Sequence, residues 1–557
     1  MTSFLTSMML AVVAYVSPVH FDVLLSGNFG EPRPNHFHGG IDIKTQQTEG
    51  KAVYAIGDGY VCRVSVSAQG HGNTVYVRHP DGYTSVYAHL QRFAPFIEAK
   101  VRQFQYSNKT TDADITLEAR ECPVAQGQLI ALSGDTGASM GPHLHLEIFQ
   151  TDNGHLMDPL AFIPELLKDS MPPVADAIMA YPQPGKGMFC GKNTPQRFDL
   201  SEGAITDSLF AWGKVGFGLF AYDQMEGSAN KLGVRFTRFL VDDKEVFSSD
   251  VDNIPLSDNK LVNIWGDYNY FIRQQEWFLK SFVEQGNTLS IIKTNNEKGV
   301  VDFNEERPYR LSYVLSDFFG NQQQFSFTVI GRREEVAPIE ETADSLHFNR
   351  DMENRIDADD VTLSVPKGGM LFDAKVKTAQ RSSRRLSHEV SFARQSVPLA
   401  EAAQLRIRLR KEVPDTNKIY VAARKFNARN PLDFDNETFV KARVDGEWVE
   451  CSIRDIGEAF VVAYDDTPPH ITPVAERAWE DQQTICVDIR DSASGLDGVE
   501  GYVDGQFVLF EYVKKSSHMV CNLRQTPIAP TGGERLLSVT ARDRCGNATT
   551  YETTIIY

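Results

Sequence analysis

The sequence predicts a mainly β protein, with an antiparallel β-sheet domain at the amino terminus followed by about three immunoglobulin-like β-sandwich domains. Short apolar segments alternate with glycine-containing turns, as in residues 53–64. The chain has 557 residues, which is too many for a single core. The same string of turn signals also occurs twice, after residues 169–173 and after residues 465–469. These observations favour a row of compact β domains.

Residues 15–168 are predicted to form the first of these domains. Hairpin turns are expected at Gly57-Asp58-Gly59 and at Pro80-Asp81-Gly82, between short apolar runs. A glycine-rich loop then leads into a strand that begins at His143. Residues 97–125 are expected to be a polar insertion of helix and loop, and residues 158–167 a short closing helix.

The repeat predicts two immunoglobulin-like β-sandwiches, at residues 172–333 and 468–557. A further β-sandwich is expected at residues 335–465, and the first copy of the repeat carries long insertions between residues 244 and 300. Each copy contains an Asp-x-x-Gly-Asn string, and we expect these strings to be turns because too few carboxylates surround them in sequence for calcium. The matching signals are Asp223, Val241-Asp242-Asp243 and Asp317-Phe318-Phe319-Gly320-Asn321 in the first copy, and Asp491, Tyr502-Val503-Asp504-Gly505 and Asp543-Arg544-Cys545-Gly546-Asn547 in the second.

Charge and composition limit the classes of partner. The formal net charge is −18, which disfavours nucleic acid because phosphate binding needs a positive surface. Residues 1–14 resemble a secretory segment with a small-residue cleavage pattern, although no Lys or Arg precedes the apolar run. No other segment is long and apolar enough for a transmembrane helix. The seven cysteines form no CxxC pair, and we favour buried thiols over a disulfide among the last three.

Five polar residues near the amino terminus predict a metal-dependent catalytic site. Nine of the thirteen histidines lie in the first 155 residues. His38 and Asp42 are four residues apart, and His143 and His145 share one face of a strand. If His38, Asp42 and one of the two strand histidines bind the same ion, two nitrogens and one oxygen leave a fourth tetrahedral position open, as in catalytic zinc sites. A further histidine, His89, lies between these motifs and suits proton transfer.

Three motifs together carry a family resemblance. They are Asn35-His36-Phe37-His38-Gly39-Gly40-Ile41-Asp42, Tyr87-Ala88-His89-Leu90 and Gly141-Pro142-His143-Leu144-His145-Leu146-Glu147. Residues 20–160 thereby resemble the lysostaphin/LytM-type zinc metallopeptidases. The resemblance implies an antiparallel β-sheet groove, Zn²⁺ held by His38, Asp42 and His145, and a catalytic pair formed by His89 and His143. It also implies the peptide stems of peptidoglycan as substrate.

The stretch before His38 departs from the family pattern. Some members have a tyrosine there that helps to stabilise the transition state, whereas this chain has Gly30-Glu31-Pro32-Arg33-Pro34. Oxyanion stabilisation would then depend on zinc and the two catalytic histidines. Close to the site in sequence, His36 and His71 are expected to be surface or supporting groups rather than ligands. Glu147 is expected either to support His145 or to be a charge on the rim.

Three functions remain open. The first is an exported zinc metalloendopeptidase that hydrolyses peptide cross-links of peptidoglycan in the periplasm or cell envelope. The second is a non-enzymatic wall-binding scaffold or activator of wall amidases. The third is a peptidase that acts on protein. The sandwich domains suggest an envelope protein partner. Residues 170–557 are expected to carry no second active site, and the boundary at residues 169–173 predicts that the first domain functions independently.

Overall fold

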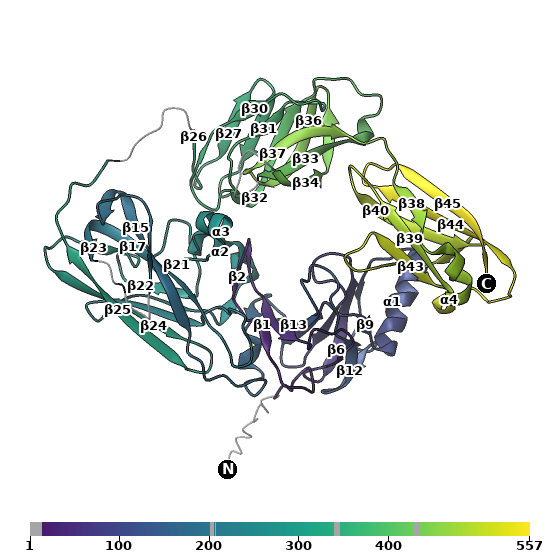
Figure 1. Cartoon of the computed structure of the whole chain (residues 1–557), viewed down its shortest axis with the longest axis horizontal. Helices are drawn as coiled ribbons and strands as arrows, with labels where there is room; N and C mark the ends of the chain where they lie inside the picture. The colour runs from purple at the N-terminus through teal and green to yellow at the C-terminus, as the bar shows by residue number, and fades with distance from the viewer. Residues whose placement is uncertain (1–13, 201–204, 206–207, 339–345, 427–433) are drawn as a thin grey trace, which may run out of the picture.

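The computed structural model describes residues 14–200, 205, 208–338, 346–426 and 434–557. The expected mainly β architecture is confirmed: antiparallel sheets dominate, and β-rich regions follow one another around a ring (Figure 1). One pair of strands, β17 with β25, is parallel. Within the described part of the chain, no helix is long and apolar enough to cross a membrane. Free thiols are found at Cys62, Cys122, Cys451, Cys486, Cys521 and Cys545.

The amino-terminal domain is built on one long antiparallel sheet. Its order is β1 (Leu25–Gly27), β4 (Gly40–Lys44), β13 (His143–Gln150), β8 (Tyr83–Ala88), β7 (Thr74–Arg78), β6 (Gly59–Val66) and β10 (Ala113–Thr116). A small sheet of β5 (Ala52–Tyr54), β12 (Leu129–Leu132) and β9 (Arg92–Phe93) packs with it, and β2 (Pro32–Arg33) pairs with β3 (His36–Phe37). β11 (Pro123–Val124) pairs with β6, and β14 (Leu156–Met157) pairs with β13.

The predicted helices are only partly present. The polar insertion begins with α1 (Pro95–Asn108) and then returns to the sheet through β10. The expected closing helix is limited to the 3₁₀ turn Pro159–Ala161. Pro164 explains the difference, because proline has no backbone N–H for a continuing helix and clashes with the preceding turn.

The next region contains a sheet with a long insertion. Its order is β16 (Gln196–Asp199), β15 (Val174–Phe189), β17 (Leu209–Tyr222), β25 (Gln322–Gly331), β24 (Pro308–Ser316), β18 (Phe236–Val241), β19 (Lys244–Asp250) and β22 (Ile292–Thr294); β21 (Leu279–Lys280) and β23 (Val301–Phe303) also pair with β17. The insertion holds β20 (Asn253–Ile254), the 3₁₀ helix Leu256–Leu261, α2 (Val262–Trp265) and α3 (Tyr268–Gln274). A separate apolar core fills this region.

Two further regions each consist of paired sheets around an apolar core. In the first, one sheet has the order β27 (Asn354–Ala358), β28 (Val361–Val365), β32 (Pro398–Arg408), β36 (Trp448–Asp455) and β35 (Ala442–Asp445). The facing sheet has the order β30 (Ala379–Arg381), β31 (Glu389–Ser391), β37 (Glu458–Tyr464), β33 (Ile419–Phe426) and β34 (Phe434–Val440). A small additional pair consists of β26 (Leu346–Phe348) and β29 (Ala374–Val376). In the second, one sheet has the order β38 (His470–Pro473), β39 (Thr484–Arg490), β43 (His518–Asn522) and β42 (Glu511–Tyr512). The facing sheet has the order β41 (Gln506–Val508), β40 (Leu496–Val503), β44 (Glu534–Asp543) and β45 (Ala548–Ile556). This region also contains the short helix α4 (Trp479–Gln482).

The last region folds back onto the first. Arg102 of α1 pairs with Glu511 of β42, and the Thr111 hydroxyl donates to the Phe510 carbonyl oxygen at 2.9 Å. Lys514 also pairs with Asp135, a carboxylate that is almost fully buried in the loop after β12. These contacts close the ring seen in Figure 1.

The insertion in the second region packs against the segment that leads to the histidine motif. Phe37 and Trp265 share an apolar cluster with Phe29, Val251 and Ile254, and all five are buried. The short strand β20 pairs with β14 of the first domain. The prediction of an independent first domain did not anticipate this interface. Separating residues 1–168 would expose these apolar side chains.

Trp265→Ala should lower the free energy of unfolding of the unit formed by the first two regions by about 3–5 kcal/mol, the usual cost of truncating a buried aromatic side chain. Denaturant titration of the full chain measures it. Trp448→Ala is the control, because Trp448 is only partly buried and lies in β36. Equal shifts of the same transition in the two variants would contradict this packing argument.

Candidate metal-dependent active site

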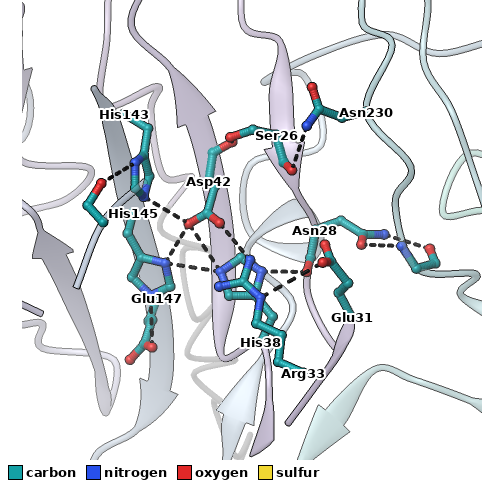
Figure 2. Close-up of polar contacts among 12 residues, drawn as sticks. Ser26, Asn28, Glu31, Arg33, His38, Asp42, His143, His145, Glu147 and Asn230 are labelled. Atoms are coloured by element: carbon teal, nitrogen blue, oxygen red, sulfur yellow. Dashed lines mark hydrogen bonds and ion pairs between the residues drawn. The ribbon is translucent and has the colours of Figure 1, made fainter. Parts of the chain in front are cut away.

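The pairing of β4 with β13 brings two of the predicted metal ligands together. The register places His145 directly opposite Asp42, and His143 opposite Lys44. His143 and His145 point to one face of the sheet, while Leu144 and its alternating neighbours are fully buried on the other. Antiparallel pairing thus creates a polar site over an apolar core (Figure 2).

This close pairing depends on glycine at position 40. A Cβ atom there would lie 2.1 Å from the carbonyl oxygen of Leu146 in β13. Any side chain would push β4 away from β13 and separate Asp42 from His145. The Gly39-Gly40 pair of the motif therefore serves the geometry of the site.

The structure brings His38, Asp42 and His145 into one buried cluster. His38 Nε2 lies 3.1 Å from both Asp42 Oδ1 and His145 Nδ1, and His145 Nδ1 lies 2.7 Å from Asp42 Oδ1. Each of the three residues is at most 6% exposed. Two imidazole nitrogens and one carboxylate oxygen that converge in this way are a donor set that zinc accepts. The residues therefore fit the metal that the sequence predicts.

Neighbouring groups orient both histidine ligands. His38 Nδ1 donates to the Asn28 carbonyl oxygen at 2.7 Å, so its Nε2 is free to bind a metal. His145 Nε2 contacts Glu147 Oε1 at 2.9 Å, which leaves its Nδ1 directed at Asp42. Such outer contacts are typical of metal-binding histidines. Of the two roles expected for Glu147, the geometry matches the supporting one.

Arg33 is a site residue that sequence reasoning missed. It lies in β2, and its Nη2 donates to Asp42 Oδ2 at 2.7 Å (Figure 2). This contact occupies the carboxylate oxygen that does not face the two histidines. Arg33 stands in the stretch where the expected tyrosine is absent, but the sequence carries no signal of where its side chain reaches.

His89 and His143 lie beside the cluster, with ring centres 4.7 Å apart. His89 Nδ1 donates to the Thr136 carbonyl oxygen at 2.8 Å, and His143 Nδ1 donates to the Gly141 carbonyl oxygen at 2.8 Å. A carbonyl oxygen can only accept, so both rings carry a proton on Nδ1, and in the neutral imidazole Nε2 is then the acceptor. His143 Nε2 lies 3.5 Å from Asp42 Oδ1.

The protonation of the cluster follows from burial and from its two carboxylates. Burial lowers the pKa of His38 to about 4 against the opposing effect of Asp42. Burial and the neighbouring imidazoles lower the pKa of His89 to about 3. For His145, burial is outweighed by hydrogen bonds to Asp42 and Glu147, which raise its pKa to about 9. Burial opposes ionisation of Asp42, but the surrounding histidines hold its pKa well below the usual range. A metal at His145 Nδ1 must therefore compete with a proton.

His71 lies next to the cluster of His38, Asp42 and His145. Its ring centre is 5.3 Å from that of His145 and 6.2 Å from that of His89, and its Nε2 lies 3.7 Å from Glu147 Oε1. Its side chain is 44% exposed. His71 thus borders the ligand cluster on the solvent side, in line with the expectation of a supporting group. His36 is exposed, and its Nδ1 donates to the Pro34 carbonyl oxygen.

Comparison with known proteins identifies the first domain. Residues 36–106 match the model of peptidase family M23, and this part of the chain is an M23 peptidase domain. Residues 345–465 match the model of the Zu5-like domain.

Three curated relatives have partial similarity to the chain. An uncharacterized metalloprotease of Haemophilus influenzae is 35% identical over 131 residues, which are 24% of this chain and 21% of that protein. The murein hydrolase activator NlpD of Escherichia coli is 32% identical over 126 residues, 23% of this chain and 26% of NlpD. The peptidoglycan DD-endopeptidase ShyC of Vibrio cholerae is 35% identical over 98 residues, 18% of this chain and 17% of ShyC. The chain spans about a quarter or less of the length of these relatives.

Removing the Glu147 carboxylate should weaken metal binding. Glu147→Ala is expected to raise the zinc dissociation constant by about 10- to 100-fold, because His145 loses the acceptor that fixes its ring. Competition with a chromogenic zinc chelator measures the constant. Glu121→Ala, at an exposed carboxylate in the same domain, is the control. Unchanged affinity in Glu147→Ala would remove Glu147 from the account of the site.

Proposed function

We propose that the protein is an exported zinc metalloendopeptidase that hydrolyses peptide cross-links of peptidoglycan. One observation carries the proposal: the group of His38, Asp42 and His145 lies beside two imidazoles, His89 and His143, whose Nδ1 atoms each donate to a backbone carbonyl oxygen. The partial similarity to a peptidoglycan DD-endopeptidase supports the substrate class. Since the similarity covers a small part of either protein, the substrate is inferred for this domain alone.

In this proposal His38 Nε2, Asp42 Oδ1 and His145 Nδ1 hold one zinc ion. Zinc, when bound, would supply a Lewis acid for hydrolysis of the peptide bond. Arg33 holds the second oxygen of Asp42 and so keeps the carboxylate oriented. The first coordination sphere then requires no thiolate, in agreement with the scattered cysteines.

His89 and His143 would orient the attacking water and transfer its proton. His143 Nε2, close to the ligand set, accepts a proton from the attacking water and returns it to the departing amine nitrogen. His89 stays neutral near pH 7 because its pKa is low, so its Nε2 accepts a second hydrogen bond from the same water and orients it. The carbonyl oxygens of Thr136 and Gly141 keep both rings in the required tautomer.

A second candidate is a non-catalytic activator of wall amidases. The similarity to a murein hydrolase activator supports it. The presence of all five predicted residues in one cluster favours catalysis, because an activator needs neither the metal nor the proton carriers. Peptidoglycan is the partner in either case.

The proposal places the protein in the periplasm or cell envelope. Curated relatives named for murein and peptidoglycan support an envelope location. The predicted export segment, residues 1–14, lies almost wholly outside the described residues. The sandwich domains would then offer surfaces for an envelope protein partner.

His145→Ala should remove the metal. The variant loses a ligand and leaves Asp42 without its cross-strand partner, so zinc is expected to fall from about one ion per chain to near zero, as measured by elemental analysis after dialysis. His155→Ala, a histidine outside the cluster, should retain zinc. Full zinc occupancy in the His145→Ala protein would exclude the proposed ligand set.

His143→Ala should keep zinc but lose turnover by about 10²–10⁴-fold, the usual contribution of a general acid or base. Purified sacculi are incubated with each protein, and mass analysis of the soluble fragments identifies new peptide ends. Wild-type protein that releases no peptide fragments, yet stimulates an added amidase, would support the activator instead. Near-normal turnover in His143→Ala would contradict its role as proton carrier.

A further inference from the structure

The same group of three aspartates occurs at two junctions between regions of the chain. Asp169, in the segment that follows the first domain, lies with Asp223 after β17 and Asp317 after β24. In each group, one carboxylate oxygen per residue lies within 4.8 Å of the others. The second group is Asp465, before β38, with Asp491 after β39 and Asp543 at the end of β44.

The asparagine of each Asp-x-x-Gly-Asn string forms hydrogen bonds that join its aspartate group to the linker. Asn321 Nδ2 donates to Asp317 Oδ2 at 2.6 Å and to the Asp169 carbonyl oxygen at 3.1 Å. In the second copy, Asn547 Nδ2 donates to Asp543 Oδ2 at 2.7 Å and to the Asp465 carbonyl oxygen at 2.8 Å. The turns expected from sequence are therefore present, and they bring in carboxylates from distant parts of the chain that sequence alone did not place there.

One oxygen in the first group has no partner. Asp223 is 6% exposed, and its Oδ1 makes no hydrogen bond. A cavity of about 30 Å³ is lined by Asp223 and Asp169. Arg235 lines the same cavity, but its ion pairs are with Asp158 and Asp250. A buried carboxylate oxygen without a donor or a cation is costly, so this arrangement points to a missing positive ligand.

The charge balance of the first group supports this reading. No ion pair joins Asp169, Asp223 or Asp317 to a described Lys, Arg or His, and the nearby cations pair elsewhere, Lys231 with Asp176 and Arg235 with Asp158 and Asp250. Burial and the neighbouring carboxylates raise the pKa of Asp223 to about 8, the effect expected when negative groups gather without a cation. The second group differs, because backbone N–H groups donate to Asp465, Asp491 and Asp543 and none of its carboxylate oxygens is buried without a partner.

We propose that the first aspartate group, Asp169, Asp223 and Asp317, binds one calcium ion. The available donors are carboxylate and carbonyl oxygens, which hard cations prefer. Calcium accepts six to eight oxygen ligands in flexible geometry, whereas magnesium requires a near-ideal octahedron and keeps its water. Three irregularly placed carboxylates from three chain segments therefore suit calcium better.

Calcium at the first junction would stabilise the edge of the peptidase sheet. The segment after Asp223 runs along β1: the Leu25 N–H donates to Met225 Sδ, and the Ser228 hydroxyl donates to the Leu25 carbonyl oxygen. β1 is the neighbour of β4, which carries Asp42.

The test is calcium binding by the zinc-loaded full chain, measured by equilibrium dialysis with radioactive calcium in excess magnesium. Wild-type protein should bind one calcium ion, and Asp223→Asn should bind none. Asp242→Asn is the matched control, since this turn aspartate lies in the same region and pairs with Arg307; it should still bind one. Asp491→Asn, in the second group, should also retain one.

A second measurement is independent of how well the variants fold. Limited proteolysis of wild-type protein should cut within residues 169–173 more slowly with calcium than with chelator, because the ion holds Asp169. Wild-type protein that binds no calcium would overturn the proposal. So would binding that Asp223→Asn leaves unchanged, or cleavage at this linker that calcium does not slow.

Discussion

The pairing of Asp42 with His145 across β4 and β13 is the contact on which the site depends. A buried carboxylate is stable only beside positive or hydrogen-bonding partners. Asp42 has Arg33 on one oxygen and imidazole nitrogens around the other. The same crowding of donors produces the proposed metal-binding cluster. The close approach of the two strands at Gly40 makes this possible, so a backbone constraint determines the chemistry.

The rest of the chain supports this centre from two sides. The insertion around α2 covers Phe37, the residue immediately before His38. On the other side, Lys514 of the last region pairs with buried Asp135, next to Thr136, whose carbonyl oxygen accepts from His89. The second and last regions therefore contact segments that position the proposed ligands and proton carriers.

The fold class and the site motifs could be predicted from the sequence because both depend on local residue patterns. Alternation and turn residues predict strands, and the His-x-His spacing fixes which side chains share a face. The structure brings all five predicted site residues together; their individual roles remain predictions. The contact of Arg33 with Asp42 was not predictable, since it depends on how β2 is placed beside β4. The packing of Phe37 on Trp265 was not predictable either, because it joins segments far apart in the chain. The aspartate groups were missed for the same reason: Asp169, Asp223 and Asp317 meet only after three segments have folded.

The most direct test of the central claim is the position of the metal in crystals of the full chain. Anomalous diffraction at the zinc absorption edge locates the ion without reference to activity. The account predicts one strong peak bound by His38 Nε2, Asp42 Oδ1 and His145 Nδ1, with His89 and His143 beside it and outside the ligand set. A peak held instead by His71 and Glu147, or no peak in zinc-loaded protein, would contradict it.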